Sequence, residues 1–226
     1  WALLFQGFRG RVNASFSRPR FVLSSRVVEI LGRREQRKQD VRDAIVAAAM
    51  KLLTERRFDD VTIDDIAATA GISRRSYFRY FPTKEAAVFP RHDARVAQFR
   101  ETLKAEASNG GFPALRKALL QLATDYGAHK EEFAFQQRLV STVPDVAGYE
   151  ANINADWEMA LKDALSELLP TVPSIDLEII SAQMIAAMRV TLRVWALTEG
   201  ADLVVLGNRV IDFLERGVGH LFEAQG

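Results

Sequence analysis

A fifteen-residue stretch from Gly71 to Glu85 gathers side chains that could bind the base edges and the backbone of a nucleic acid. It reads GISRRSYFRYFPTKE and holds three arginines, one lysine and four aromatic rings. Arginine can donate two hydrogen bonds to guanine in the major groove, and an aromatic ring can pack on the methyl group of thymine. Hydroxyl and ammonium groups suit phosphate oxygens, which position a protein without reading base sequence. The composition therefore indicates duplex DNA as a partner, provided that a helix presents these groups together.

Helical spacing divides this stretch into two faces. Ile72, Tyr77 and Phe81 have the spacing of an inner face, so the cations and Phe78 point outward. We assign contacts with bases to Arg74, Arg75, Phe78 and Arg79. We assign contacts with phosphates to Ser76, Tyr80, Lys84 and Thr62, the last through backbone N–H groups at a helix N-terminus. A solvated structural helix is the alternative, but such a helix rarely exposes an aromatic ring between arginines.

Two short helices with a tight turn are expected to position these groups. Thr62 and Asp65 form a predicted capping box at the start of the first helix. Gly71 supplies the left-handed residue that ends it, and Ser73 caps the second helix. The order is that of a helix-turn-helix, whose second helix lies in the major groove. The predicted helices span residues 62–70 and 73–80.

The segment from Thr62 to Phe89 resembles the DNA-binding signature of the tetracycline-repressor (TetR) family. The matching residues are Thr62, Ile66–Ala67, Ala70–Ser73, Phe78, Tyr80–Phe81 and Thr83–Glu85. The resemblance implies a homodimer that binds a palindromic operator, most commonly as a repressor released by a small-molecule effector. Two residues depart from the pattern, because Phe78 stands where tyrosine is frequent and Tyr77 stands where leucine is common. The Tyr77 hydroxyl therefore needs a partner.

The rest of the chain reads as further helices, so the predicted fold class is all-α. The resemblance implies an N-terminal three-helix helix-turn-helix DNA-binding domain and a C-terminal helical ligand-binding and dimerisation domain. Pro90 lies inside the helix that starts at Thr83 and is expected to kink it. Residues 1–36 are expected to be a basic extension that is disordered or derived from an expression tag. Residues 37–84 are expected to form the DNA-binding domain, and residues 85–226 the C-terminal domain. Later helices are predicted over 114–128, 130–142, 145–168, 175–198 and 202–222.

The formal net charge of +1 conceals an uneven distribution along the chain. Residues 1–38 hold nine basic and two acidic side chains (+7), residues 39–84 hold eight and seven (+1), and residues 85–226 hold thirteen and twenty (−7). A basic head on an acidic body suggests a polyanionic partner for the head alone. Four basic residues before the first helix could form a minor-groove arm or a merely solvated tail. They are Arg33, Arg34, Arg37 and Lys38.

Several other classes of function find no support in the sequence. The chain has no cysteine, and His92, His129 and His220 lack metal-ligand spacing. No glycine-rich phosphate loop or nucleophile motif is present, so we expect no enzyme activity, metal or cofactor. No apolar run reaches the roughly 18 residues that a membrane span requires. We therefore expect no membrane partner and a cytoplasmic location.

Large apolar side chains recur at helical spacing in the acidic body, where they could line an effector cavity or form ordinary core. The predicted ligand-binding residues are Phe133, Phe135, Leu139, Trp157, Leu161, Met184, Met188 and Arg189. Candidate polar anchors are Gln136, Gln137, Arg138 and Arg189. An arginine that faces an apolar cavity suggests a lipophile bearing a carboxylate or a phosphate.

One face of each of the last two predicted helices carries small and branched residues. Such faces are expected to form the homodimer interface that the resemblance implies. The residues are Ala182, Ala186, Val190 and Val194 on one helix, and Val205, Val210 and Phe213 on the other.

Two other functions stay open, a helical protein-interaction module and an activator without a small-molecule inducer. An interaction module predicts no salt-dependent affinity for DNA. A DNA-binding regulator predicts an affinity that falls steeply with salt, because phosphate contacts release counterions.

Overall fold

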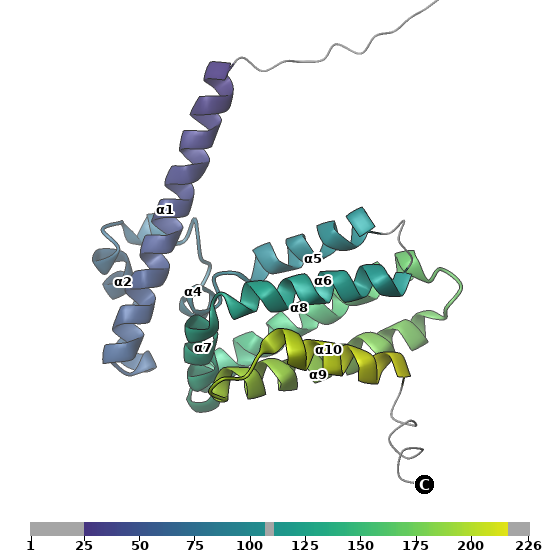
Figure 1. Cartoon of the computed structure of the whole chain (residues 1–226). Helices are drawn as coiled ribbons and strands as arrows, with labels where there is room; N and C mark the ends of the chain where they lie inside the picture. Colours follow the sequence, from purple (N-terminus) through teal and green to yellow (C-terminus); the bar gives the residue numbers. More distant parts are fainter. Residues whose placement is uncertain (1–24, 107–110, 217–226) are drawn as a thin grey trace, which may run out of the picture. The chain divides into compact units, whose positions relative to one another are not determined.

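Residues 25–106 and 111–216 are described by the computed structural model, and within these ranges every regular element is a helix (Figure 1). The predicted all-α class is confirmed. The chain divides into two compact units, residues 1–41 and residues 42–226, and each is described by itself. The boundary predicted between residues 84 and 85 lies inside the second unit and stays a prediction. No described helix is both long enough and apolar enough to cross a bilayer.

The first helix, α1, spans Ser25–Glu55 and is much longer than predicted. Residues 25–36, expected to be part of an extension, are helical, while residues 1–24 lie outside the described part. The four basic residues of the predicted arm therefore belong to a helix, and Lys38 pairs with Glu35 at 3.2 Å. A helix is too wide for the minor groove of B-DNA, which is about 6 Å across, so the extended arm is wrong.

The second unit begins with the C-terminal part of α1, followed by a 3₁₀ turn η1 (Phe58–Asp60), α2 (Ile63–Thr69) and α3 (Arg74–Tyr77). Apolar residues at three- and four-residue steps form its core, because this spacing keeps them on one helical face. The buried residues include Ile45, Ala49, Leu53, Phe58, Val61, Ile66, Tyr77 and Phe81.

Two helices replace the single kinked helix predicted around Pro90. They are α4 (Lys84–Val88) and α5 (His92–Glu106), which the connector Phe89–Arg91 separates. Proline lacks the N–H that a continuing helix would need, and its ring clashes with the preceding turn. Pro90 therefore ends the helix rather than bending it.

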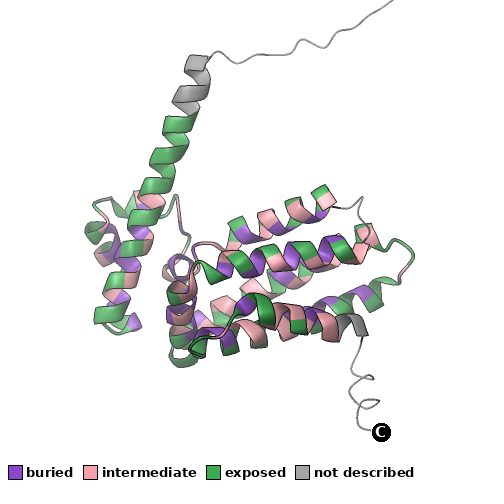
Figure 2. Cartoon of the chain, in the orientation of Figure 1, coloured by how far each residue is buried: buried purple, intermediate pink, exposed green. Residues whose placement is uncertain are grey.

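The remaining described helices form the C-terminal body. They are α6 (Gly111–Gly127), α7 (Lys130–Thr142), α8 (Pro144–Leu168), α9 (Ser174–Leu197) and α10 (Leu203–Arg216). Helix α6 packs against α5 and α10, and α9 packs against α8 and α10. Figure 2 shows that buried positions recur along one face of these helices, as amphipathic packing requires. The predicted bounds agree within a few residues, although residues 217–222 of the last predicted helix lie outside the described part.

Replacement of Tyr77 by phenylalanine tests how the buried hydroxyl contributes to the fold. Tyr77 is 0% exposed and its hydroxyl donates to the Thr83 carbonyl at 2.9 Å. Burial raises the pKa of Tyr77, so the group stays a neutral donor. We expect Tyr77→Phe to lower the free energy of unfolding in urea by about 1–2 kcal/mol, because a carbonyl loses its partner. Tyr80→Phe is the matched control, and an equal loss in both variants would contradict this role.

Candidate nucleic-acid interface and effector cavity

The turn between α2 and α3 is built as the sequence predicts. Gly71 has a φ of 69°, and the Ile72 N–H donates to the Ala67 carbonyl at 2.9 Å. Ser73 Oγ accepts a hydrogen bond from the Ser76 N–H at 3.2 Å, which confirms the N-cap. Helix α3 is shorter than the predicted residues 73–80, since the backbone bonds tighten to i,i+3 at Arg79 and Tyr80.

The outward face of α3 presents the predicted base-contacting groups to solvent. Phe78 is 45% exposed, although it is a large apolar ring. Arg74 Nη1 donates to Asp64 Oδ2 at 2.6 Å, and Arg79 Nη2 donates to Ser76 Oγ at 3.3 Å. Arg75 is exposed and makes no polar contact with the described residues. Because an exposed ion pair contributes little free energy, Arg74 can exchange Asp64 for another acceptor, and Arg75 can bind one directly.

Thr62 is occupied by its own capping box. Its N–H and its hydroxyl donate to Asp65 Oδ2 at 2.9 and 2.7 Å, and its Oγ1 accepts from the Asp65 N–H at 3.1 Å. The backbone hydrogen bond from Thr62 is the main reason why the pKa of Asp65 lies below its usual value. With Asp64 beside it, this helix end is negative, so the geometry favours a structural role for Thr62 over the predicted phosphate contact.

Lys84 is directed into its own domain and not toward solvent. Its ammonium donates to the carbonyls of Phe58 and Val61 at 2.6 and 2.8 Å and lies 3.9 Å from the centre of the Phe58 ring. An ammonium has three donors, and two of these are used within the protein. The phosphate contact assigned to Lys84 therefore needs correction, because Lys84 joins the start of α4 to the η1 turn. Ser76 and Tyr80 are both half-buried, and their contact with phosphates remains a prediction.

A cavity of about 60 Å³ lies in the C-terminal body and opens to solvent. It is lined by four of the eight predicted residues, Phe133, Trp157, Met188 and Arg189, and by the candidate anchors Gln136 and Gln137. The other predicted residues do not line it. Leu161 and Met184 belong to the packed core, and Phe135, Leu139 and Arg138 surround a surface pocket beside α1 residues Leu53 and Thr54.

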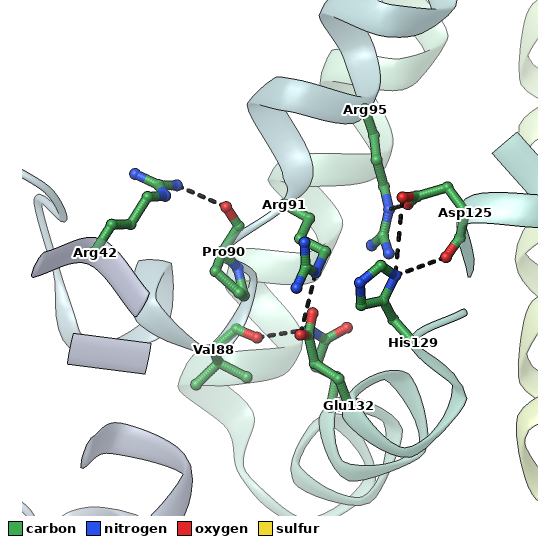
Figure 3. A network of polar contacts seen from close by, with 9 residues as sticks. Arg42, Val88, Pro90, Arg91, Arg95, Asp125, His129 and Glu132 are labelled. Atoms are coloured by element: carbon green, nitrogen blue, oxygen red, sulfur yellow. Dashed lines mark hydrogen bonds and ion pairs between the residues drawn. The ribbon is translucent and has the colours of Figure 1, made fainter. Parts of the chain in front are cut away.

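Sequence reasoning missed the most buried cation of the cavity. Arg95 is 5% exposed, and its Nε donates to Asp125 Oδ2 at 2.6 Å (Figure 3). Its guanidinium lies 3.8 Å from the centre of the Tyr126 ring. Asp125 also contacts His129, whose Nδ1 donates to the Asp125 carbonyl at 2.7 Å. A signal was available, because Arg95 lies four residues before the buried Phe99 and so shares its helical face.

Polar side chains hold the connector between α4 and α5 (Figure 3). Gln136 Nε2 donates to the Val88 carbonyl at 2.7 Å, and Arg42 Nη2 donates to the Pro90 carbonyl at 2.6 Å. Arg91 pairs with Glu132 at 3.2 Å. Gln136 also lines the cavity, so one side chain contacts both the cavity and the backbone that leads to the helix-turn-helix.

Substitution of Lys84 separates its structural role from the predicted phosphate contact. We expect Lys84→Ala to lower the free energy of unfolding in urea by about 1–3 kcal/mol, because buried carbonyls lose charged donors. The exposed Lys51 gives the control, Lys51→Ala. The salt dependence of DNA binding should stay that of the unaltered protein. A slope of log K against log salt reduced by about one would restore the phosphate role.

Two family models match separate parts of the chain. The model described as bacterial regulatory proteins of the tetR family matches residues 45–88, and the model described as the MftR C-terminal domain matches residues 111–219. The HTH-type transcriptional regulator EthR of Mycolicibacterium smegmatis is 26% identical over 161 residues, covering 65% of this chain and 72% of EthR. The putative mycofactocin biosynthesis transcriptional regulator MftR of Mycobacterium tuberculosis is 32% identical over 110 residues. That match covers 48% of this chain and just over half, 56%, of MftR.

Solved structures share the fold. FadR of Thermus thermophilus, a TetR-family transcriptional repressor in complex with lauroyl-CoA, superposes with a TM-score of 0.58 at 24% identity, covering 78% of this chain and 94% of FadR. FadR of Bacillus subtilis in complex with stearoyl-CoA superposes with a TM-score of 0.54 at 20% identity. The match covers 76% of this chain and 96% of that FadR. Because the two family models together match more than half of the residues, this chain belongs to the TetR family of transcriptional regulators.

Proposed function

We propose that this protein is a repressor that binds a palindromic operator as a homodimer in the cytoplasm and is released by a small lipophilic effector. The observation that carries the proposal is the hydrogen bond from Gln136, a residue of the cavity wall, to Val88, the last residue of α4. This hydrogen bond links the proposed effector cavity to the domain that carries the exposed arginines of the recognition segment. An activator without an inducer would not need such a joint.

Operator binding is proposed to rest on the outward face of α3. Arg74 and Arg75 are exposed there, and the exposed Phe78 and Arg79 follow in the turn directly after α3. The arginines can donate to guanine and the ring can pack on a thymine methyl group. Ser76 and Tyr80 are proposed to contact phosphates, which fix the register of the helix.

A lipophilic effector is proposed from the apolar walls of the cavity. Phe89, Phe133, Trp157, Ile185 and Met188 supply most of that surface. Apolar pockets with a few convergent polar groups are typical ligand sites. The two FadR structures hold lauroyl-CoA and stearoyl-CoA, which supports an apolar chain as part of the effector.

Release of the operator is proposed to follow from competition for the connector. Phe89 and His92, on either side of Pro90, also line the cavity. An effector that displaces Gln136 or Phe89 would shift the end of α4 and hence the position of the recognition segment. The effector and the operator would then weaken each other's binding by the same factor.

Exposed apolar side chains on α9 and α10 support the proposed dimer. Contiguous exposed apolar patches mark interaction sites. The exposed apolar side chains of α9 and α10 include Ile179, Val190, Val194, Leu197, Val204 and Val205. Three of the predicted interface residues, Val190, Val194 and Val205, belong to this set, whereas Val210 lines an internal cavity.

Substitution of Arg75 tests the proposed contact with bases. Once an operator has been selected from a random DNA pool, Arg75→Ala should lower the affinity for it by about 1–3 kcal/mol, because a bidentate contact is lost. Affinity for unrelated DNA should change less, as fluorescence-anisotropy titration at fixed salt would measure. Arg100→Ala, which removes the same charge from exposed Arg100 of α5, is the control. Equal losses on both DNAs would count against base reading.

Substitution of Val205 tests the proposed dimer. Val205 is 64% exposed on α10. We expect Val205→Glu to convert a dimer to a monomer in light scattering at micromolar concentration, because a carboxylate buried without a partner is costly. Met159→Glu on α8, where Met159 is also exposed, should leave the dimer intact. An unaltered protein that is already monomeric would refute the dimer.

A further inference from the structure

Two buried polar atoms beside the cavity lack a hydrogen-bond partner among the described residues. They are His92 Nδ1 and Arg95 Nη2. Both residues line the cavity, and they lie three positions apart on α5, which places them on one face of the helix. A buried polar atom without a partner destabilises the folded protein, so such atoms are rare without a reason. A ligand that brings complementary atoms would remove this cost.

The charge of Arg95 is already neutralised by the protein. Its Nε donates to Asp125 at 2.6 Å and its guanidinium covers the Tyr126 ring. The remaining Nη2 group is therefore a hydrogen-bond donor on a paired cation. It can be satisfied by an uncharged oxygen and does not call for an anion.

His92 offers a hydrogen-bond acceptor, whereas Arg95 offers a donor. Its Nε2 lies 3.1 Å from Asp156 Oδ2, and a carboxylate accepts hydrogen bonds, so Nε2 carries the proton in the uncharged ring. Nδ1 is then left as an acceptor. Burial raises the pKa of the neighbouring Tyr126 hydroxyl, which stays a neutral group. Donor and acceptor groups thus meet at this end of the cavity.

The charges around the cavity do not favour an anionic head group. Glu150 lines the cavity, and Asp125 and Asp156 stand behind Arg95 and His92. The only guanidiniums among the described lining residues are those of Arg95 and Arg189. The lining itself holds two guanidiniums and one carboxylate, but Arg95 is paired with Asp125 and Arg189 is exposed. Neither guanidinium is therefore a buried, unpaired cation, in contrast to the carboxylate-bearing effector that the sequence suggested.

A second cavity, of about 40 Å³, continues the apolar surface. It lies between α6, α9 and α10, and Tyr126, Met188 and Leu192 line both cavities. Its other walls are almost entirely aliphatic, with Leu119, Leu122 and Leu203 among them. An apolar chain that starts near Arg95 can extend along these shared residues.

We infer that the effector is an uncharged long-chain compound with an oxygen function, an alcohol or a carbonyl compound. The oxygen accepts from Arg95 Nη2, a hydroxyl donates to His92 Nδ1, and the chain follows Tyr126 and Met188 toward the second cavity. The inference rests on the proposed function only in treating this cavity as the effector site.

Ligand titrations without DNA test this inference. Trp157 lines the cavity, so its fluorescence can follow the binding of 1-decanol, undecane and decanoate. We expect 1-decanol to bind about tenfold more tightly than undecane, as one satisfied buried donor implies. We also expect it to bind more tightly than decanoate.

Arg95→Lys keeps a cation beside Asp125 but lacks the second arm of the guanidinium. The variant should bind 1-decanol no better than undecane. Arg91→Lys is the matched control, because Arg91, in the connector just before α5, pairs with Glu132 of α7 and does not line the cavity. It should keep the preference for 1-decanol. If Arg95→Lys fails to fold, as circular dichroism would show, His92→Phe gives a second measure and should weaken 1-decanol selectively.

Three results would overturn the inference. Tightest binding of decanoate would mean that the site prefers an anion. Equal binding of 1-decanol and undecane would mean that water alone satisfies the two polar atoms. Binding of none of the three ligands would mean that the cavity takes no such chain. Operator release is measured separately, so a ligand that binds as expected without releasing DNA would count against the proposed function alone.

Discussion

A proline inside a helical segment imposes the constraint on which much of this structure depends. Pro90 cannot continue the helix that starts at Lys84, so the carbonyls around it lack helical partners in a region where Val88 and Pro90 are buried. Side chains from distant helices must supply the missing donors. Gln136 of α7 reaches Val88 and Arg42 of α1 reaches Pro90. The need to satisfy two backbone carbonyls thus ties the cavity wall and the helix-turn-helix to the same connector.

Features that depend on local chemistry could be predicted from the sequence. Helix periodicity, the caps at Thr62 and Ser73 and the left-handed Gly71 all depend on residues a few positions apart. The bounds of α7 are as predicted, residues 130–142. Helix α1 was predicted too short because residues 1–36 were interpreted as a basic extension, although Val27, Ile30 and Leu31 have helical spacing.

Features that depend on long-range contacts could not be predicted. Lys84 reaches carbonyls more than twenty positions earlier in the chain, and only the folded domain brings them together. Apolar stripes predict burial but not which side of a helix faces a cavity. Leu161 and Trp157 therefore looked alike, although both belong to the core and only Trp157 also lines the cavity. Arg95 was overlooked because a buried cation requires a partner, and Asp125 lies thirty positions away.

Arg42 contacts the end of the recognition segment as well as the connector. Its Nη1 lies 3.4 Å from the Tyr80 carbonyl, and its guanidinium covers the Phe81 ring at 4.4 Å. One side chain therefore braces the end of the recognition segment and the Pro90 carbonyl together. In the proposed release mechanism, these contacts would therefore make the recognition segment move together with a shifted connector. Collective rotations of this kind take microseconds to milliseconds, so the regulator can answer a change in effector concentration without unfolding any part of its DNA-reading surface.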